Sequence, residues 1–249
     1  MVIKTDALVL REQNIGENDR IVTLLTRDRG IIRAFAKVAG KAKSGLQSAT
    51  QSLCYSNFTI NIGKTANRIK EAEAVEVYFG LRQDIEKVAL AQYFTQLVSE
   101  VAPEGNESDE LLKIMLNTLH FLHNGKKKPE QLKAIIELRV ACMCGYMPAL
   151  ECCDRCGAEA NEKYILDLIN GVLMCEACGI NPRGAYAIVG GGVLTALRYI
   201  TEVDVSKVFS FNMSDDSFRM LGDVTERYLL AQLQRSFSAL DFYKTVKEL

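Results

Sequence analysis

The sequence predicts an α+β protein: a small five-stranded β-barrel at the N-terminus is followed by a helical domain with an inserted four-cysteine module. Three observations predict this fold class. Short β-branched runs fill the first ~80 positions, apolar residues recur at helical spacing after Gly80, and two Cys-x-x-Cys pairs interrupt the later helical segments. The expected domains are the barrel at 1–80, a helical domain in two parts at 81–150 and 183–249, and the cysteine module at 151–182.

The N-terminal part contains five segments with the composition and the apolar–polar alternation of β-strands. Five short strands within ~75 residues favour a closed sheet of the OB type, the barrel of the oligonucleotide-binding fold. The third and fourth segments are separated by VAGKAKSGL, a stretch with no core to bury, so we expect a mobile basic loop there. The expected strands are Val2 to Leu10, Arg20 to Thr26, Gly30 to Lys37, Cys54 to Ile62 and Arg68 to Tyr78.

Helical spacing begins after the barrel. The segment from Asp84 to Val101 places Ile85, Val88 and Tyr93 on one face of a helix. The helices that follow the cysteine module are expected to pack on the earlier ones. Ser108 is a plausible N-cap of the second helix, and Pro129 stands at a first-turn position of the third. Besides the first helix, the expected helices are Ser108 to Leu122, Pro129 to Gly145, Gly192 to Thr201 and Asp215 to Ser236.

The length and composition are those of a globular protein with a buried core, since 48% of the 249 residues are hydrophobic. The N-terminus lacks the apolar run of a signal peptide, and no stretch approaches the ~20 apolar residues of a membrane helix. We therefore expect a cytoplasmic protein with no membrane partner. In a long, unsecreted chain, eight cysteines favour metal binding over a disulfide framework.

Four of the cysteines have the spacing of a zinc site. Cys153 and Cys156 form one pair, Cys175 and Cys178 form the other, and about 18 residues separate the pairs. Each pair can form a knuckle around one tetrahedral metal, with the following glycine turning the backbone. Because four sulfurs fill the coordination shell, we predict one structural Zn²⁺ with no open position for catalysis. A thioredoxin-type redox role fits less well, because it needs one such pair opening a helix beside a βαβ unit.

The other cysteines and both histidines are expected to be structural. Cys152 directly precedes the first pair and is one residue too far from the next cysteine. His120 and His123 lie on one expected helix without a neighbouring carboxylate or cysteine, so we expect structural or surface side chains. The expected core thiols are Cys54, Cys142 and Cys144.

The charges are unevenly distributed although the net charge is only -1. From Met1 to Lys70 there are about 12 lysines and arginines against about 5 acidic residues, and the remainder is acidic overall. The N-terminal part is therefore a candidate surface for a polyanion, and a solvated face without a partner is the open alternative. For the run from Lys126 to Lys128, an exposed linker is favoured over an anion site.

No catalytic constellation is visible in the sequence. Gly63-Lys64-Thr65 matches the end of a phosphate-binding loop, but Phe58 stands where the motif requires its first glycine. The setting is also strand to strand instead of strand to helix. We therefore expect a protein that is not an enzyme.

Four segments spread over nearly the whole chain carry a family resemblance. They are IGENDRIVTLLTRDRGIIRAFAKVAGKAKSGL, QSLCYSNFTI, RVACMCGYMPAL, and the Cys-x-x-Cys-Gly pairs flanking YILDLINGVLMC. In these segments the chain resembles the RecO family of bacterial recombination mediators. One departure is Ser52, where the family usually has proline after the glutamine. Some relatives lack the cysteines, which agrees with a metal that supports folding.

The resemblance implies a non-enzymatic DNA-binding protein. Members of the family bind single- and double-stranded DNA, anneal complementary strands, and help RecA displace single-strand-binding protein, with RecR as the expected partner. A nucleoid-associated location follows from that role. No bond is made or broken in annealing, which needs a surface that neutralises phosphate repulsion.

The resemblance also points to candidate DNA-binding cations. Tyr55 and Phe58 lie in an expected strand, and core packing is the favoured interpretation for both. Lys133 and Arg139 are candidates for the acidic tail of single-strand-binding protein. The first choices for phosphate contacts are Arg33, Lys37, Lys41 and Lys43, and the second choices are Arg20, Arg27, Arg29 and Arg68.

Two other functional classes remain open on the sequence alone. A zinc-ribbon protein-interaction adaptor would have the same cysteine pairs and no affinity for DNA. A metal-dependent nuclease would cut DNA when divalent ions are added. A strand-annealing assay in the presence of single-strand-binding protein separates both from a recombination mediator.

Overall fold

The computed structural model describes residues 1–15, 19–37, 44–159, 163–179 and 184–248. These residues cluster into two compact units, one of Met1–Lys126 with Phe237–Leu249 and the other of Lys127–Ser236. The boundaries of these units differ from those of the four segments expected from the sequence. The division into four domains therefore stays a prediction.

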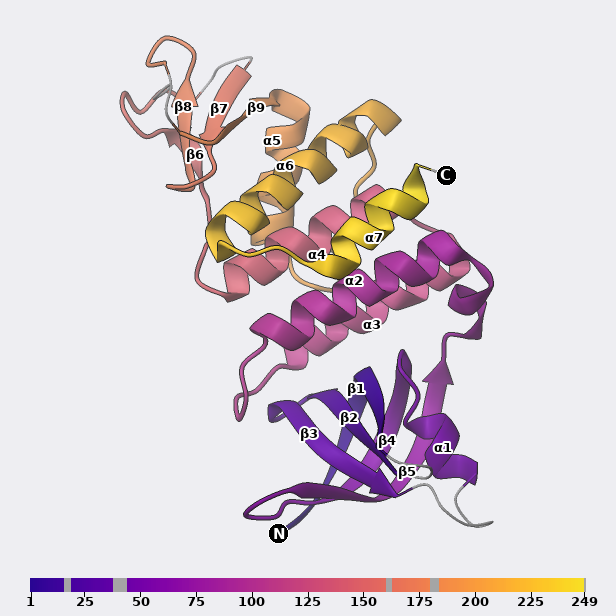
Figure 1. The fold of residues 1–249 in the computed structure, drawn as a ribbon. Helices are drawn as coiled ribbons and strands as arrows, with labels where there is room; N and C mark the ends of the chain where they lie inside the picture. The colour runs from indigo at the N-terminus through magenta and orange to yellow at the C-terminus, as the bar shows by residue number, and fades with distance from the viewer. Residues whose placement is uncertain (16–18, 38–43, 160–162, 180–183, 249) are drawn as a thin grey trace. The chain divides into compact units, whose positions relative to one another are not determined.

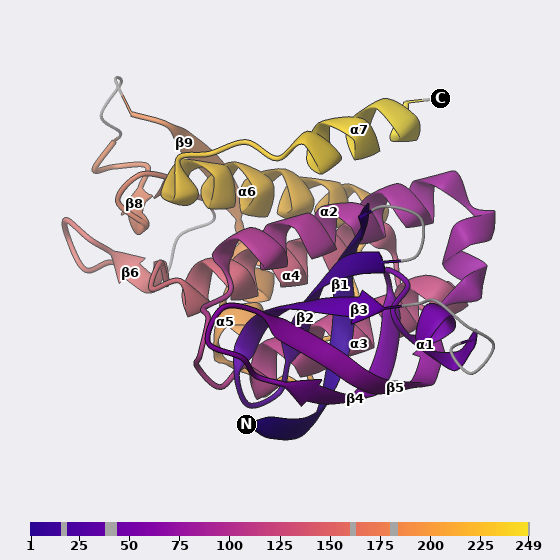
Figure 2. The same ribbon diagram turned by 60° about the horizontal axis from the view of Figure 1, so that its bottom comes forward.

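The first unit contains a closed five-stranded barrel (Figures 1 and 2). The strands follow the order β1-β2-β3-β5-β4, and β4 pairs with β1 to close the barrel. Only the β3–β5 pairing is parallel among the five pairings of this barrel. All five expected strands are present, and the α+β class with an OB-type barrel is confirmed. The strands are β1 Val2–Ile15, β2 Asp19–Thr26, β3 Gly30–Lys37, β4 Cys54–Asn61 and β5 Asn67–Val77.

Alternation along the strands separates the barrel core from its surface. In β3, Ala34 and Ala36 are buried in the core, and the residues between them face outward. Phe58 and Ile60 of β4 fill the interior, so the expected core role of Phe58 is confirmed. The barrel interior is apolar and packed with side chains, and any ligand of the barrel must bind on its outside.

The expected basic loop between β3 and β4 is partly wrong. Residues 38–43, which include Lys41 and Lys43, lie outside the described residues, but Ser44–Ala49 forms the helix α1. Leu46 of α1 is buried against the barrel core, so this stretch does have an apolar side chain to bury. After α1, the backbone N–H of Ser52 donates to Glu12 at 3.2 Å. A proline at this position would have no N–H to make that bond.

Helices α2, α3 and α7 complete the first unit. Asp84 caps α2 by accepting a hydrogen bond from the backbone N–H of Lys87 at 3.1 Å. Ser108 occupies the expected N-cap position of α3, but its hydroxyl makes no capping bond. The helix α7 was not expected separately, since the sequence pattern predicted one helix up to Ser236. The elements are η2 Phe79–Gln83, α2 Ile85–Val101, α3 Asp109–Asn124 and α7 Ser238–Lys247, which packs on α2.

The turn between β2 and β3 is fixed to the loop between α2 and α3. Ile31 donates its backbone N–H to the carbonyl of Pro103, and Gly105 donates to the carbonyl of Arg29, both at 3.0 Å. Gly30, between them, has a φ of +59°. A Cβ atom at this position would overlap the carbonyl oxygen of Pro103. Only glycine fits this close approach of two backbones.

We expect Gly30→Ala to destabilise the protein by about 2–3 kcal/mol, since it adds left-handed strain to a backbone clash. Urea unfolding followed by circular dichroism measures the change. Gly45→Ala is the matched control, because no atom lies within 4 Å of a Cβ there and its φ is negative. In α1 that change is expected to be neutral or slightly stabilising. Equal stability of the two variants would contradict the close packing at Gly30.

The second unit combines three helices with a four-stranded sheet of order β6-β8-β7-β9. β7 and β8 form an antiparallel hairpin, and β6 and β9 extend it on either side. α6 packs on α4, as expected for the helices that follow the module. The elements are α4 Pro129–Met143, β6 Ala149–Cys153, β7 Lys163–Asp167, β8 Val172–Cys175, β9 Tyr186–Gly190, α5 Gly191–Glu202 and α6 Asp215–Leu233. Across the described ranges, no helix is long and apolar enough to cross a membrane.

Candidate metal centre and nucleic-acid interface

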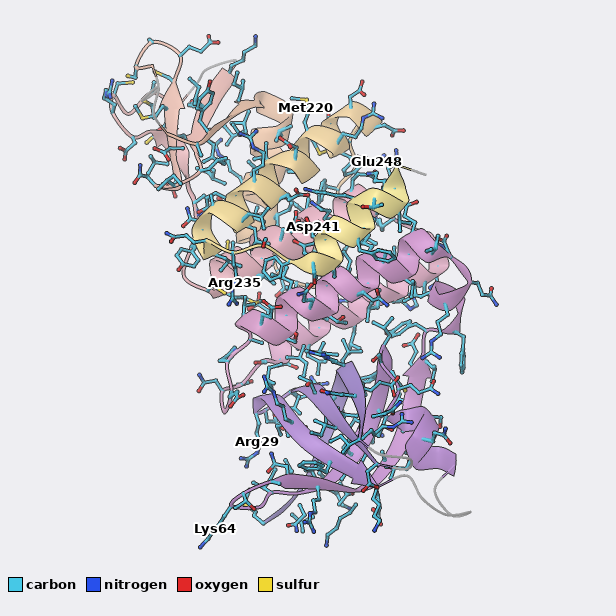
Figure 3. All side chains as sticks on the ribbon, viewed as in Figure 1. Arg29, Lys64, Met220, Arg235, Asp241 and Glu248 are labelled. Carbon is cyan, nitrogen blue, oxygen red and sulfur yellow. The ribbon has the colours of Figure 1, made fainter. Side chains whose placement is uncertain are left out.

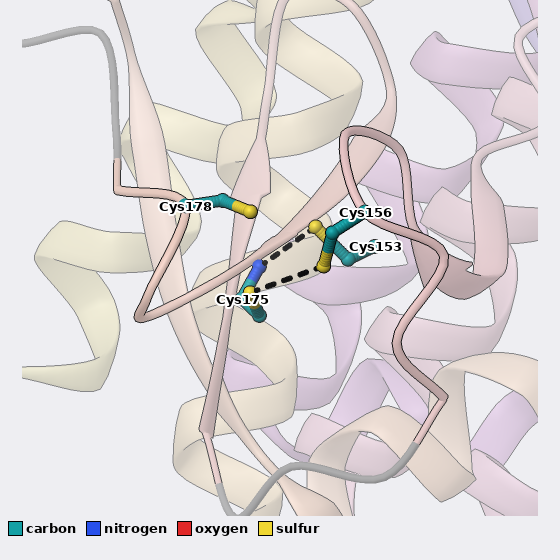
Figure 4. Close-up of side chains that lie close together, drawn as sticks. All are labelled: Cys153, Cys156, Cys175 and Cys178. Atoms are coloured by element: carbon teal, nitrogen blue, oxygen red, sulfur yellow. Dashed lines mark hydrogen bonds between the residues drawn. The ribbon is translucent and has the colours of Figure 1, made fainter.

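The sulfur atoms of Cys153, Cys156, Cys175 and Cys178 all lie within 4.8 Å of one another (Figure 4). The parallel pairing of β6 with β8 explains this clustering, because each strand ends at the first cysteine of a pair. The sulfurs of Cys156 and Cys175 are 3.7 Å apart. A tetrahedral zinc with Zn–S bonds of ~2.3 Å needs sulfurs ~3.8 Å apart. The four residues can therefore hold one metal ion.

Backbone turns hold the two knuckles in shape. The N–H of Gly157 donates to the carbonyl of Cys153 at 2.8 Å, and the N–H of Gly179 donates to the carbonyl of Cys175 at 3.2 Å. Both glycines have positive φ, 72° and 66°, as the sequence predicted for the turn behind each pair. Arg155 joins the knuckles by donating from its guanidinium to the carbonyl of Cys178 at 2.6 Å.

The hydrogen bonds within the cluster favour the thiolate form of Cys153. Cys175 donates its backbone N–H to the sulfur of Cys153 at 3.3 Å. Together with the N–H of Cys156, this bond lowers the pKa of the Cys153 thiol to about 6. Thiolate is the form that ligates zinc. The four-sulfur donor set fits a structural zinc ion and leaves no ligand position for water.

The remaining thiols agree only in part with the expectation of core residues. Cys54 is fully buried, and burial raises its pKa. Cys142 and Cys144 are half-buried, so they are not core residues in the strict sense, because both lie at the C-terminal end of α4. Cys152 is also half-buried, and Cys153 is the residue that belongs to the cluster.

The outward faces of β1, β3 and β5 carry exposed cations. Arg11 of β1 pairs with Thr23 of β2, and Thr23 pairs with Arg33 of β3, so the two arginines lie in one row across the sheet. Lys37 follows on the same face of β3, and Arg68 lies on β5. Among the described residues, the side chains of these four cations have no ion-pair or hydrogen-bond partner. This set, Arg11, Arg33, Lys37 and Arg68, is named the barrel cations.

A groove of about 900 Å³ opens beside the barrel cations, between the barrel and α2. Arg11, Arg33 and Arg82 line it together with polar side chains such as Gln13 and Gln92. The carboxylate of Glu12, also in the groove, is already paired with Arg20. Glu100 also lines the groove and accepts a hydrogen bond from Gln96. The groove thus carries the positive charge of Arg11 and Arg33, which suits an anionic chain.

Two of the second-choice arginines hold the fold together. Arg20 pairs with Glu12 at 2.6 Å, and only 11% of its side chain is exposed. Arg27 pairs with Asp6 of β1 at 2.6 Å and with Asp109 at the start of α3. Hydrogen bonding from Arg27 holds the pKa of Asp6 below its ordinary value. These side chains are engaged inside the unit, whereas Arg29 and Lys64 project from loops of the barrel (Figure 3).

Family models match the two halves of this chain. The model described as Recombination protein O N terminal matches residues 1–78, and Recombination protein O C terminal matches residues 82–241. The chain belongs to the RecO family. The first RecO model covers the barrel, and the second covers the cysteine cluster. The relatives described below are named DNA repair proteins, and the family assignment therefore places this chain among proteins of DNA repair.

Similar RecO proteins match this chain over more than nine-tenths of their own length. DNA repair protein RecO of Acetivibrio thermocellus is 33% identical over 98% of this chain and 97% of its own. The protein of the same name from Pelotomaculum thermopropionicum is 30% identical, over 96% and 92%. The one from Alkaliphilus metalliredigens is 28% identical, over 99% and 100%.

Sequence reasoning on this RecO chain missed two features of the candidate interface. Arg11 was not selected, because its alignment with Arg33 depends on the register of two strand pairings, β1 with β2 and β2 with β3. Phe35 was not selected either, although its position between Arg33 and Lys37 in an alternating strand was a usable signal. Tyr55, expected in the core, is half-buried and donates its hydroxyl to Asp6.

Proposed function

We propose that this RecO-family protein is a non-enzymatic DNA-binding recombination mediator. In this proposal it binds single- and double-stranded DNA and anneals complementary strands. It also assists RecA loading onto DNA covered by single-strand-binding protein, together with RecR. The observation that carries the proposal is the set of barrel cations, which are exposed and lack carboxylate partners among the described residues.

The barrel cations suit annealing for a physical reason. Two complementary strands repel each other through their phosphates, and cations that contact both backbones reduce this repulsion. Contacts to phosphate do not read the bases, so one surface serves every sequence. An interior filled with Phe58, Ile60 and other apolar side chains leaves the outer face of the barrel as the binding surface.

The cysteine cluster has a supporting role in the proposed function. We infer that it holds one structural zinc, because four closely spaced thiolates form a closed shell. Its place at the ends of β6 and β8 joins two strands that would otherwise meet over only two residue pairs. The metal would fix this sheet and take no part in DNA chemistry.

Lys133 and Arg139 are poor candidates for an exposed partner site. Lys133 is 6% exposed and its ammonium contacts two carboxylates, so its charge is already satisfied. Arg139 is 9% exposed and donates to the carbonyl of Val203. Binding of the acidic tail of single-strand-binding protein stays a proposal without assigned residues.

The salt dependence of DNA binding tests the proposed function. Replacing Arg33, Lys37 and Arg68 with Ala should flatten the slope of log affinity against log salt by about 2 units for single-stranded DNA. Each lost phosphate contact releases ~0.7 fewer counterions, and three contacts are removed. Fluorescence anisotropy at several salt concentrations measures the slope, and affinity should fall similarly for all sequences.

The matched control replaces Lys126, Lys127 and Lys128 with Ala. This lysine run has the same charge as the mutated set, and Lys128 is already paired with Asp215. The control should keep the wild-type slope. A slope that changes only in this control would place the DNA at the lysine run, and no affinity of the wild type for DNA would favour a zinc-ribbon adaptor.

A further inference from the structure

Phe35 is an aromatic side chain on the outer face of β3, and 41% of it is exposed. Its neighbours Ala34 and Ala36 are buried in the barrel, so alternation directs the ring outward. Ile21 of β2 lies directly across from Phe35 in the strand pairing and is half-buried. The ring therefore has an aliphatic support on one side and a face open to solvent.

Cations surround this ring. Arg33 and Lys37 lie two residues before and after Phe35 on the same face, which places them about 6–7 Å away along the strand. Arg68 of β5 is the residue paired with Phe35 on the other side. The exposed ring thus lies within the barrel cations, where a negatively charged chain would pass.

A hollow of about 440 Å³ adjoins the ring and is lined by Phe35, Lys37, Arg68 and Asp19. One carboxylate oxygen of Asp19 is buried and has no hydrogen-bond partner among the described residues. A carboxylate here disfavours a phosphate inside the hollow but can accept a hydrogen bond from an amino group. Nucleobases offer such amino groups, whereas the cations at the rim suit the phosphates.

We propose that Phe35 stacks against an unpaired nucleobase of single-stranded DNA, with the adjoining backbone phosphates on Arg33, Lys37 and Arg68. The proposal rests on the DNA-binding function proposed above and adds to it a preference for unpaired bases. In duplex DNA each base face is covered by its neighbours, so the ring would gain contact only with a single strand. Stacking tolerates every base, because each has a π-face.

A protein partner could also cover an exposed phenylalanine. The surrounding cations and the partnerless oxygen of Asp19 favour nucleic acid, since an interface core in proteins is depleted of charge. Removing the ring separates the two, because a protein contact would leave the affinity for DNA unchanged.

The test uses the full chain with the variant Phe35→Leu, which keeps an apolar β-strand residue and removes the ring. Binding to a base-containing single strand should weaken by roughly 5- to 150-fold. Binding to an abasic oligonucleotide of equal length, and to a duplex, should stay at the wild-type level. The salt slope should also be unchanged, because no phosphate contact is lost. Phe242→Leu, a change of a 46% exposed phenylalanine on α7, is the matched control and should bind as wild type.

A direct readout follows from the absence of tryptophan in the sequence. Phe35→Trp introduces a single tryptophan, whose emission should be quenched by a base-containing strand and not by the abasic one. Phe242→Trp should show neither effect. Circular dichroism of each variant checks that it is folded.

The outcomes separate this proposal from the proposed function. If the wild type binds single strands and Phe35→Leu binds them equally well, stacking is wrong and DNA binding stands. If Phe35→Leu loses affinity for the abasic strand as well, the ring positions the backbone instead of a base, and stacking is again wrong. If the wild type binds no DNA, both proposals fail together.

Discussion

Replacement of Cys175 with Ser is expected to abolish zinc binding and to unfold the β6–β9 sheet. Cys175 is 2% exposed and ends β8, so its loss removes a ligand at the point where the two knuckles meet. A structural zinc contributes ~10 kcal/mol or more to a small module, far more than this four-stranded sheet can replace by packing. Elemental analysis should find one zinc per chain in the wild type and none in the variant, and hydrogen exchange should locate the unfolding in the sheet.

Cys152→Ser provides the matched control for the zinc prediction. Cys152 neighbours the cluster in sequence but does not belong to it, so the variant should keep its zinc and its sheet. Acidification should release the metal from the wild type, because protonated thiols do not ligate zinc. Protein purified without chelators and found to contain no zinc would contradict the metal site.

Replacement of Lys133 with Met is expected to destabilise the second unit by about 3–5 kcal/mol, because it removes the lysine cation from beside a fully buried carboxylate. The ammonium of Lys133 contacts Glu137 on α4 and Glu226 on α6, each at 2.8 Å. Glu137 has no exposed surface, and it also accepts a hydrogen bond from the hydroxyl of Thr225 at 2.8 Å. Urea unfolding followed by circular dichroism measures the loss.

The stability lost in Lys133→Met should depend on pH. Burial raises the pKa of Glu137, and removal of Lys133 should raise it further. A carboxyl whose folded pKa lies above its unfolded value favours folding in acid, and this contribution is lost as pH rises through the folded pKa. The deficit of Lys133→Met should therefore be largest near neutral pH and shrink toward pH ~4–5.

Two further variants control the Lys133 prediction. Lys128→Met removes an exposed ion pair with Asp215 and should cost less than about 1 kcal/mol. Adding Glu137→Gln to Lys133→Met should recover part of the loss, because one buried negative charge is removed. Equal effects of Lys128→Met and Lys133→Met would show that the buried charge cluster does not stabilise the unit.

Local pattern determined much of the barrel and of the metal site. β3 was expected at Gly30 to Lys37, and the strand has these bounds, because alternation and β-branching act within the strand itself. The helix from Pro129 was expected for the same kind of reason, since Pro at the first turn is a local signal. The spacing of the two cysteine pairs also identified the four residues whose sulfurs cluster.

Contacts between distant parts of the chain determined the helices that the local sequence pattern did not predict. The helix α1 formed where a loop was expected, because Leu46 has an apolar partner only once the barrel has closed. The end of α6 at Leu233 and the separate helix α7 follow from packing of α7 on α2, a contact between distant parts of the sequence. Propensity within a segment is a weak guide where tertiary contacts decide.

The sequence by itself determined the five barrel strands, the main helices, the family resemblance and the four candidate zinc ligands. Only the tertiary structure decided which cations are available. Arg27 and Arg33 look alike in sequence, yet Arg27 is held by Asp6 and Asp109, whereas Arg33 lies exposed beside Phe35. The physical reason is that a charge is engaged or left free by the residues that strand register and helix docking bring beside it, and these come from distant parts of the chain.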